Sequence, residues 1–414
     1  MVNRIRVFLL ASIAGLAIVG SLKLNFLDQV SVELRLLVIP TIGLVSALTV
    51  ADPETKKNYS RLINSTLGLL MSLILLLTVA SLYISPTAYF KIFTTLLISI
   101  LCFYLSYFVG VSTKTSQIFE KAIVLITCTA GVVVSIASIS ILIGGESVVE
   151  FVHRFIEDIN YRYILYDLGR GRIYPIFPPA YFIGIITFVY LTNIRNGQNV
   201  VFFLIILGFG VISLYASNYR VLGLIGTIAL VFASTRALKI RWWKIAPIIL
   251  LISLTPALLL PTHRVKRSLL TDNTDIDSIN GRLAMVSRFI DLALDNHFVG
   301  LGLGNATEAE DSDLESLTGI FPTNQNPHNI YLQLLVEGGI PLAAVYTALV
   351  FLLVRNNIRL LRHNKTAPLM KILSLTCILF FFASAIERHS FNVFVYTFTL
   401  QGVVYGRSVT IGKG

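Results

Sequence analysis

The 414-residue sequence is poor in charged residues and in cysteine. Charged residues make up 13% of the chain, against about 25% in a typical soluble domain. This deficit argues against a water-soluble enzyme, a nucleic-acid-binding protein and a disordered chain. The three cysteines, Cys102, Cys128 and Cys377, all lie in apolar runs. We interpret them as small buried hydrophobic residues rather than as a disulfide framework or a metal site.

Hydrophobic residues make up 55% of the chain and form long runs. A membrane helix needs about 20 apolar residues to cross a hydrocarbon core of about 30 Å. Twelve candidate spans centre on 6–22, 33–50, 63–84, 88–110, 121–143, 176–192, 199–215, 220–235, 245–260, 330–354, 368–386 and 389–406. We therefore expect an all-α polytopic membrane protein with one integral-membrane domain over residues 1–414. The basic start leads directly into the first run, without an evident cleavage site.

Lysine and arginine predict the orientation, because short cytoplasmic loops retain them. With the N-terminus in the cytoplasm, the inner segments hold Arg4, Arg6, Lys56, Lys57, Arg61, Lys114, Lys121, Arg195, Arg236, Lys239, Arg241, Lys244, Arg355, Arg359, Arg362, Lys365, Lys371, Arg407 and Lys413. The short outer connections hold only Lys23, Arg220 and Arg388, with Arg35 and Lys91 near outer helix ends. Both termini are therefore predicted to be cytoplasmic.

Two outer loops are long, at 144–175 and 261–329. The second resembles a small extracytoplasmic subdomain. Asn280 is a candidate cap for a helix beginning at Gly281, and Leu283, Val286, Ile290 and Leu294 would share one face of it. Gly300, Gly302 and Gly304 end the segment. Their G-x-G-x-G spacing is interpreted as a flexible turn, because no preceding strand supports a phosphate-binding loop.

Two arginines at predicted outer positions are candidate phosphate ligands. Arg220 follows Ser217 in a tight turn between apolar spans, and Arg282 lies at the start of the loop helix. A planar guanidinium suits phosphate oxygens better than an ammonium group does. The alternative for Arg220 is an interfacial charge that reaches lipid head groups. Arg288 is expected to be a solvated surface charge.

His328 is the candidate proton acceptor. Asn326 would cap the next helix and Pro327 would occupy its first position, so that His328 falls in the first turn. The positive helix end disfavours imidazolium and leaves a neutral imidazole. Asn329 would orient it or a sugar hydroxyl, and the alternative is a purely structural histidine. Further along, Gly338, Gly339 and Pro341 predict a break or the close approach of another helix.

Other outer charges complete the candidate site. Glu387 and Arg388 lie between the last two spans and either pair with each other or approach Arg220 or His328. Arg170 and Arg172, flanked by glycines, either contact an anionic glycan or diphosphate or are ordinary interfacial charges. Arg264, with Lys266 and Arg267, is either a lipid head-group anchor or a substrate contact.

These motifs together resemble the O-antigen ligase and polymerase superfamily of bacterial membrane glycosyltransferases. The resemblance rests on Ser217–Leu222 around Arg220, on Gly281–Met285, and on Pro327-His328-Asn329 running to Glu337-Gly338-Gly339. The motifs occur in the family's order and cover roughly residues 210–390. The first 140 residues agree only as generic hydrophobic spans.

The resemblance implies transfer of a glycan from undecaprenyl diphosphate to a sugar hydroxyl at the periplasmic face of the inner membrane. A ligase uses lipid A–core oligosaccharide as the acceptor, whereas a polymerase uses another carrier-linked repeat. The family's outer arginines correspond to Arg220 and Arg282 and its catalytic histidine to His328, with Glu387 in the approximate place of a ligase acidic residue. The Gly281–Met285 stretch favours a ligase.

No cofactor or metal is expected, since no outer carboxylate cluster has metal-ligand spacing. The partners implied are the lipid-linked donor, the glycan acceptor and membrane lipids, without nucleic acid. Two other classes share the many spans. A lipid-linked oligosaccharide transporter would carry basic residues deeper in its spans and show internal repeats. A non-catalytic assembly protein is the third alternative.

Overall fold

The computed structural model describes only part of the chain. The described residues are 2–19, 22–26, 30–33, 38–50, 62–84, 90–112, 114–123, 126, 156–158, 243, 247, 286–303, 329–363, 366–383 and 391–411. The five predicted spans between 121 and 260 fall wholly or mostly outside these residues.

Seven helices occupy the remaining predicted spans. They are α1 (Val2–Val19), α2 (Val38–Val50), α4 (Thr66–Ile84), α5 (Phe90–Val111), α15 (Ile330–Arg362), α16 (Pro368–Ala383) and α17 (Phe391–Ile411). The mainly helical fold class is thus confirmed for the described part of the chain. By length and composition, α15 is the one helix there that could cross a membrane, and α2, α4, α5 and α16 contain shorter apolar stretches.

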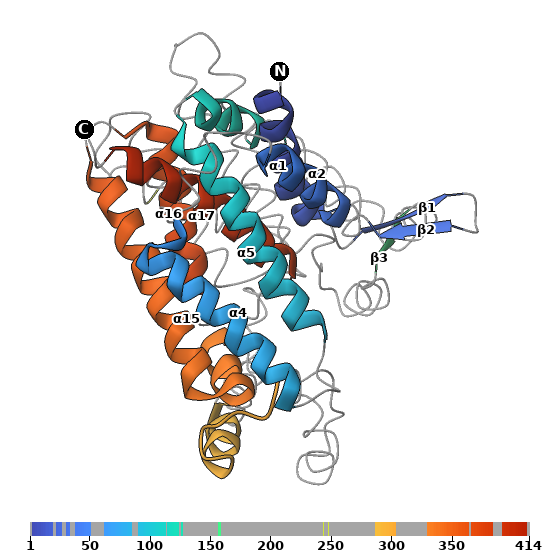
Figure 1. Cartoon of the computed structure of the whole chain (residues 1–414), viewed down its shortest axis with the longest axis vertical. Helices are drawn as coiled ribbons and strands as arrows, with labels where there is room; N and C mark the ends of the chain where they lie inside the picture. The colour runs from blue at the N-terminus through green and yellow to red at the C-terminus, as the bar shows by residue number, and fades with distance from the viewer. Residues whose placement is uncertain are drawn as a thin grey trace.

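A small sheet was not predicted. Strands β1 (Leu22–Phe26), β2 (Val30–Glu33) and β3 (Ile156–Asp158) form an antiparallel sheet in the order β2-β1-β3, at the edge of the bundle (Figure 1). Leu24 pairs with Val32 on one side and with Ile156 on the other. Apolar and polar residues alternate along β1 and β2, which is the period of a strand. The expectation of an all-α chain therefore missed this local signal, and β3 joins the loop at 144–175 to the first outer connection.

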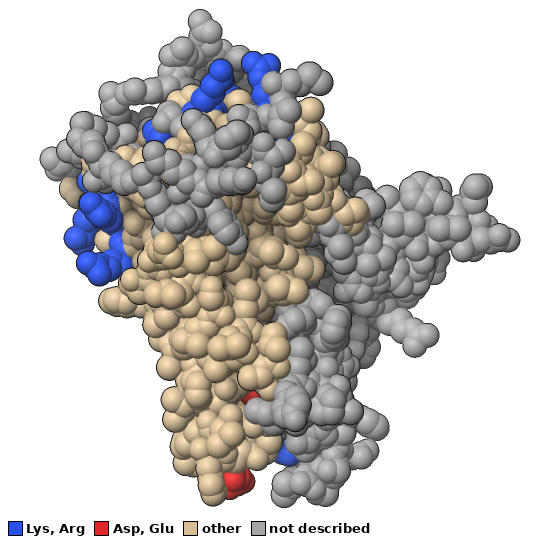
Figure 2. Space-filling model, in the orientation of Figure 1, with Lys and Arg blue, Asp and Glu red and all other residues tan. Residues whose placement is uncertain are grey.

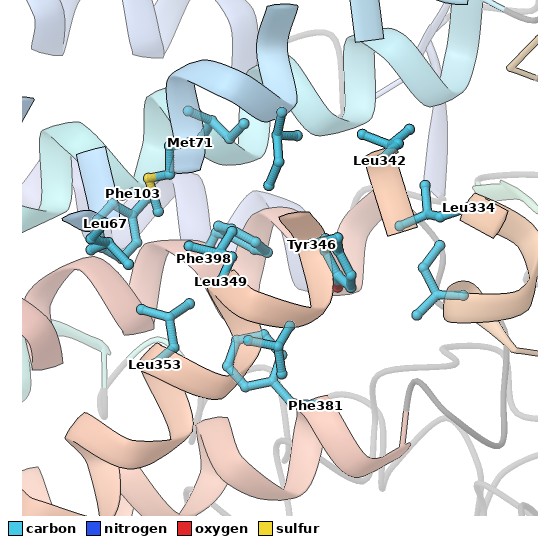
Figure 3. Close-up of a cluster of buried hydrophobic side chains, with 14 of the residues drawn as sticks. Leu67, Met71, Phe103, Leu334, Leu342, Tyr346, Leu349, Leu353, Phe381 and Phe398 are labelled. Atoms are coloured by element: carbon cyan, nitrogen blue, oxygen red, sulfur yellow. The ribbon is translucent and has the colours of Figure 1, made fainter. Parts of the chain in front are cut away.

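The core lies among five helices, α4, α5, α15, α16 and α17. Figure 3 shows side chains from all five converging on one cluster. It includes Leu67 and Met71 of α4, Phe103 of α5, Tyr346 and Leu349 of α15, Phe381 of α16 and Phe398 of α17. The cluster therefore joins α4 and α5 to the three helices near the C-terminus.

Helices α5 and α17 approach each other most closely where glycines replace side chains. Gly402 and Gly406 have the G-x-x-x-G spacing, and they face the backbone of α5. A methyl group at Gly406 would meet Tyr107 O and lie 2.9 Å from Val111 N, and one at Gly110 would meet Val403 O. Small residues at this spacing let membrane helices pack backbone to backbone.

Apolar side chains are also exposed in stripes. Leu69, Leu73, Leu76 and Val79 lie along α4, and Phe351 and Ile358 along α15. A soluble protein would bury such stripes, whereas lipid covers them in a membrane protein. The described cysteines are buried like other small apolar residues. Cys102 and Cys377 are free and buried, as predicted, and Cys128 lies outside the described residues.

Candidate functional site at the start of α15

The helix predicted to carry the catalytic histidine begins later than expected. Asn329 is the N-cap of α15, with extended backbone (φ −142°, ψ 109°). Its Oδ1 accepts hydrogen bonds from the N–H groups of Tyr331 (2.9 Å) and Leu332 (3.1 Å). The prediction that Asn326 caps the helix and Pro327 begins it is therefore wrong. His328 therefore precedes the cap and does not fall in the first turn, where it was predicted. The residue type could not decide between Asn326 and Asn329, which are equally good capping residues.

Helix α15 is sharply broken at Gly339, as the Gly338-Gly339 and Pro341 signals predicted. Gly339 has φ 71° and ψ −178°, which is not helical. The rings of Tyr331 and Tyr346 have centroids 5.6 Å apart, whereas a straight helix would separate these positions by about 22 Å. The first arm, 330–338, therefore folds back beside the second, 340–362. The second arm alone exceeds the length of a span, so the predicted span at 330–354 is replaced by two arms.

The break exposes backbone groups that a docked segment satisfies. Pro341 has no N–H to donate to the carbonyl four residues earlier, and Glu337 O instead accepts from Gly302 N (2.9 Å). Leu301 N donates to Val336 O (2.9 Å), and Ile340 N donates to Phe298 O (3.0 Å). We call residues 298–302 with 336–340 the backbone clamp. Irregular backbone at membrane depth requires such internal partners.

Glycines make the backbone clamp possible. Gly300 (φ 99°) and Gly302 (φ 92°) adopt left-handed conformations that glycine alone adopts readily. A methyl group at Gly300 would lie 2.6 Å from Gly339 N and 2.7 Å from Glu337 O. The interpretation of this G-x-G run as a flexible turn is therefore corrected for Gly300 and Gly302, which form a close backbone contact. Gly304 lies outside the described residues.

A helix at 286–295 docks on the first arm of α15. Phe289 and Ala293 are buried against Val336, and Leu303 N donates to Ser81 Oγ of α4 (2.9 Å). Ile290 and Leu294 share one face of the helix, as predicted, and this face is exposed (43% and 50%) rather than docked. Apolar periodicity could not choose between two adjacent apolar faces. The start predicted at Gly281 and the position of Leu283 lie outside the described residues.

A buried polar pair follows the N-cap by one turn. Gln333 Nε2 donates to Glu337 Oε1 (3.1 Å), and the two side chains are 5% and 1% exposed. A charged or polar group within an apolar helix is costly and usually functional in membrane proteins. In the sequence, Glu337 stands out only as part of the motif that continues to Gly338 and Gly339. The i, i+4 spacing of an amide and a carboxylate in an apolar helix was the available signal.

A hydrogen bond joins the first turn of α15 to the last turn of α16. Tyr331 Oη donates to Phe381 O (3.3 Å), and Glu387 and Arg388 lie in the connection between α16 and α17. Of the predicted site residues, Asn329 alone is described. Arg170, Arg172, Arg220, Arg264, Arg282, His328, Glu387 and Arg388 lie outside the described residues.

Comparison with known proteins finds one family that is similar to part of the chain. The protein family described as O-antigen ligase matches residues 180–347, a segment that ends within the second arm of α15. No curated protein and no solved structure matches the chain. The matched segment includes the motifs around Arg220, Arg282 and His328. The match supports the resemblance to the O-antigen ligase and polymerase superfamily over this part of the chain.

Proposed function

We propose that the protein is an O-antigen ligase-type glycosyltransferase. It transfers a glycan from undecaprenyl diphosphate to a sugar hydroxyl of lipid A–core at the periplasmic face of the inner membrane. The observation that carries this proposal is the family match over residues 180–347, because it spans all three motifs. A carrier diphosphate is already a good leaving group, so the proposed reaction needs no metal.

The proposed chemistry is a single displacement. Arg220 and Arg282 hold the diphosphate and stabilise the negative charge that develops as the anomeric C–O bond breaks. The acceptor oxygen forms the new bond to the anomeric carbon while His328 takes its proton. Undecaprenyl diphosphate leaves, and the anomeric configuration inverts. Because His328 adjoins the N-cap of α15, the positive helix end favours its neutral form.

The geometry around Asn329 supports a substrate-binding role. Its Oδ1 is engaged in the cap, so its Nδ2 is the group that would donate to a sugar hydroxyl. The Tyr331–Phe381 hydrogen bond supports a site that also includes Glu387 and Arg388. Arg170, Arg172 and Arg264 would supply further contacts to the anionic donor.

The distribution of charge supports the proposed topology. Figure 2 shows Lys and Arg side chains gathered at the end of the molecule where Figure 1 places both termini. Figure 1 places the segment 286–303, drawn in yellow, at the opposite end. Retention of basic residues in the cytoplasm would put 286–303 and the start of α15 outside.

The decisive experiment compares acceptors and variants with purified protein. We expect transfer from a carrier-linked glycan to lipid A–core, and loss of about 10²–10⁴-fold in the His328→Gln variant, which cannot take up a proton. Arg220→Lys and Arg282→Lys should also lose activity, because an ammonium cannot rebuild a bidentate contact, whereas Arg288→Lys is the matched control. Growth of carrier-linked repeats without acceptor would identify a polymerase, the second member of the family. Normal turnover of His328→Gln would refute its role as the base.

A further inference from the structure

We propose that the helix at 286–295 is an interfacial element whose Ile290–Leu294 face lies in the acyl region of the outer leaflet. From the sequence alone, the loop at 261–329 resembles a small extracytoplasmic subdomain. The docked helix instead presents the pattern of side chains expected at a boundary between protein, lipid and water.

The helix has three distinct faces. Phe289 and Ala293, at 0% and 2% exposure, pack on the protein. Next to them, Ile290 and Leu294 are 43% and 50% exposed. The third face is polar, with exposed Ser287, Asp291 and Asp295. With 3.6 residues per turn, the apolar exposed face lies between the buried face and the polar face. An apolar exposed face beside a charged one is typical of helices that lie in the plane of a membrane interface.

The apolar face continues onto surfaces that a bilayer covers. Val299 and Ile340 are 65% and 52% exposed, and they are held together where Ile340 N donates to Phe298 O. Ile340 begins the second arm of α15, whose exposed residues include Phe351 and Ile358. Lipid that contacts this arm would therefore reach the docked helix without interruption. This continuity favours acyl chains over a protein partner as the occupant.

The backbone of the docked segment is compatible with this depth. Its irregular residues donate and accept through the backbone clamp, and Leu303 N has Ser81 Oγ as an acceptor. Unsatisfied backbone groups would otherwise exclude a non-helical segment from the hydrocarbon region. The polar face, with Asp291 and Asp295, limits how deeply the helix can lie, which places it at the surface of the outer leaflet.

The position of this helix also affects how the lipid-linked donor would be bound. This part of the inference rests on the proposed function. Arg282 precedes Val286 by four positions, which span at most about 14 Å. An interfacial helix would therefore hold Arg282 close to the membrane surface. The diphosphate of a polyprenyl carrier lies at that level, because its tail remains in the hydrocarbon. The helix would thus place a phosphate ligand where the lipid-linked donor presents its phosphates.

Tryptophan quenching tests the membrane contact directly. The chain has two tryptophans, and Trp242→Phe with Trp243→Phe gives a silent full-length background. In vesicles of phosphatidylcholine brominated near the head group, Leu294→Trp should lose more emission to the brominated lipid than to aqueous iodide. Asp295→Trp, the adjacent control on the polar face, should show the reverse order. Quenching of Leu294→Trp by iodide and not by brominated lipid would overturn the proposal.

A second site and an activity measurement complete the test. Ile290→Trp should repeat the result of Leu294→Trp, so that a folding defect in one variant does not decide the outcome. In active protein, Leu294→Asn should raise KM for the lipid-linked donor more than it lowers kcat. An unchanged KM would refute the link to the donor. Quenching does not depend on catalysis, so the two proposals are tested separately. A wild-type protein without transfer activity would refute the proposed function, whereas the quenching result alone decides the membrane contact.

Discussion

The α5–α17 contact and the backbone clamp both require glycine, but for different physical reasons. Between α5 and α17, Gly402 and Gly406 remain helical and only remove side-chain bulk. In the backbone clamp, Gly300 and Gly339 also adopt positive φ, and the backbone around them bonds across two segments. The first arrangement needs only a small residue, whereas the second needs both small size and a left-handed conformation. We therefore expect the backbone clamp to tolerate substitution less well and to couple more strongly to the site.

Gly339→Ala should have the largest effect. Its methyl group would meet Val299 O and lie 2.6 Å from Phe298 O. Left-handed strain costs about 1–3 kcal/mol, and overpacking adds about 1–3 kcal/mol. We expect a lower unfolding temperature in detergent and, in the remaining folded protein, a loss of glycan transfer. The control is Gly43→Ala in α2, which has open space around it and should gain about 0.5–1 kcal/mol. Equal stability of the two variants would contradict the backbone clamp.

Gly406→Ala should have an intermediate effect, confined to stability. The methyl group would lie 2.9 Å from Val111 N and 3.0 Å from Gly110 Cα, and separating the two helices should cost about 1–3 kcal/mol. At matched amounts of folded protein, kcat and KM for transfer should remain those of the wild type, because the contact lies outside the candidate site. A changed KM at normal stability would show that the α5–α17 contact also shapes the substrate site.

Substitutions at Asn329 separate capping from substrate binding. Asn329→Ala should destabilise the protein by about 0.5–2 kcal/mol, because two N–H groups of α15 lose their acceptor. Asn329→Asp keeps the acceptor and adds a charge that the helix N-terminus favours, so its unfolding temperature should be close to wild type. If Nδ2 donates to the sugar, the Asp variant should nevertheless transfer glycan more slowly. Wild-type transfer in Asn329→Asp would limit Asn329 to the cap.

The two regions also differ in how much of them the sequence predicts. Hydropathy locates α5 and α17 within a few residues, because long apolar runs leave few alternatives. Gly338, Gly339 and Pro341 predict the break in α15. The segment that satisfies the break comes from residues 298–302, and nothing local specifies that pairing. The buried face at 286–295 was missed because the adjacent exposed face is apolar as well.

At the site itself, the motifs around Arg220, Arg282 and His328 led to the family whose model matches residues 180–347. They could not specify the N-cap, because Asn326 and Asn329 are equally suitable by residue type. Nor could they show that Gln333 and Glu337 form a buried hydrogen bond, since burial depends on the fold-back of the first arm. Residue types were therefore enough to predict the family resemblance, whereas the geometry that depends on distant backbone contacts was not predictable from them.

The smallest expected effect concerns Glu120, in the helix at 114–123. This helix follows α5, at the end of the α5–α17 pair that the charge pattern predicts to be cytoplasmic. Burial raises the pKa of its carboxyl group above the usual 4.5, while the Ser116 hydroxyl and the charge of Arg407 oppose this shift. Ser116 Oγ donates to Glu120 Oε1 at 3.2 Å. Because the folded state holds the proton more tightly than the unfolded chain does, this contribution to stability is complete below pH 4.5 and is lost as the pH rises through the raised pKa.

Glu120→Gln keeps an acceptor for Ser116 and cannot ionise. The unfolding temperature of the variant should therefore fall less than that of the wild type as the pH rises from the usual carboxyl range toward neutrality. Thermal unfolding at a series of pH values, with Lys121→Gln as a control for an exposed neighbouring charge, measures the difference. Identical pH profiles for wild type and Glu120→Gln would mean that Arg407 offsets the cost of burial. A steeper fall in the variant would mean that the ionised Glu120 joins α17 to the helix at 114–123, and electrostatics would then add to glycine packing in that region.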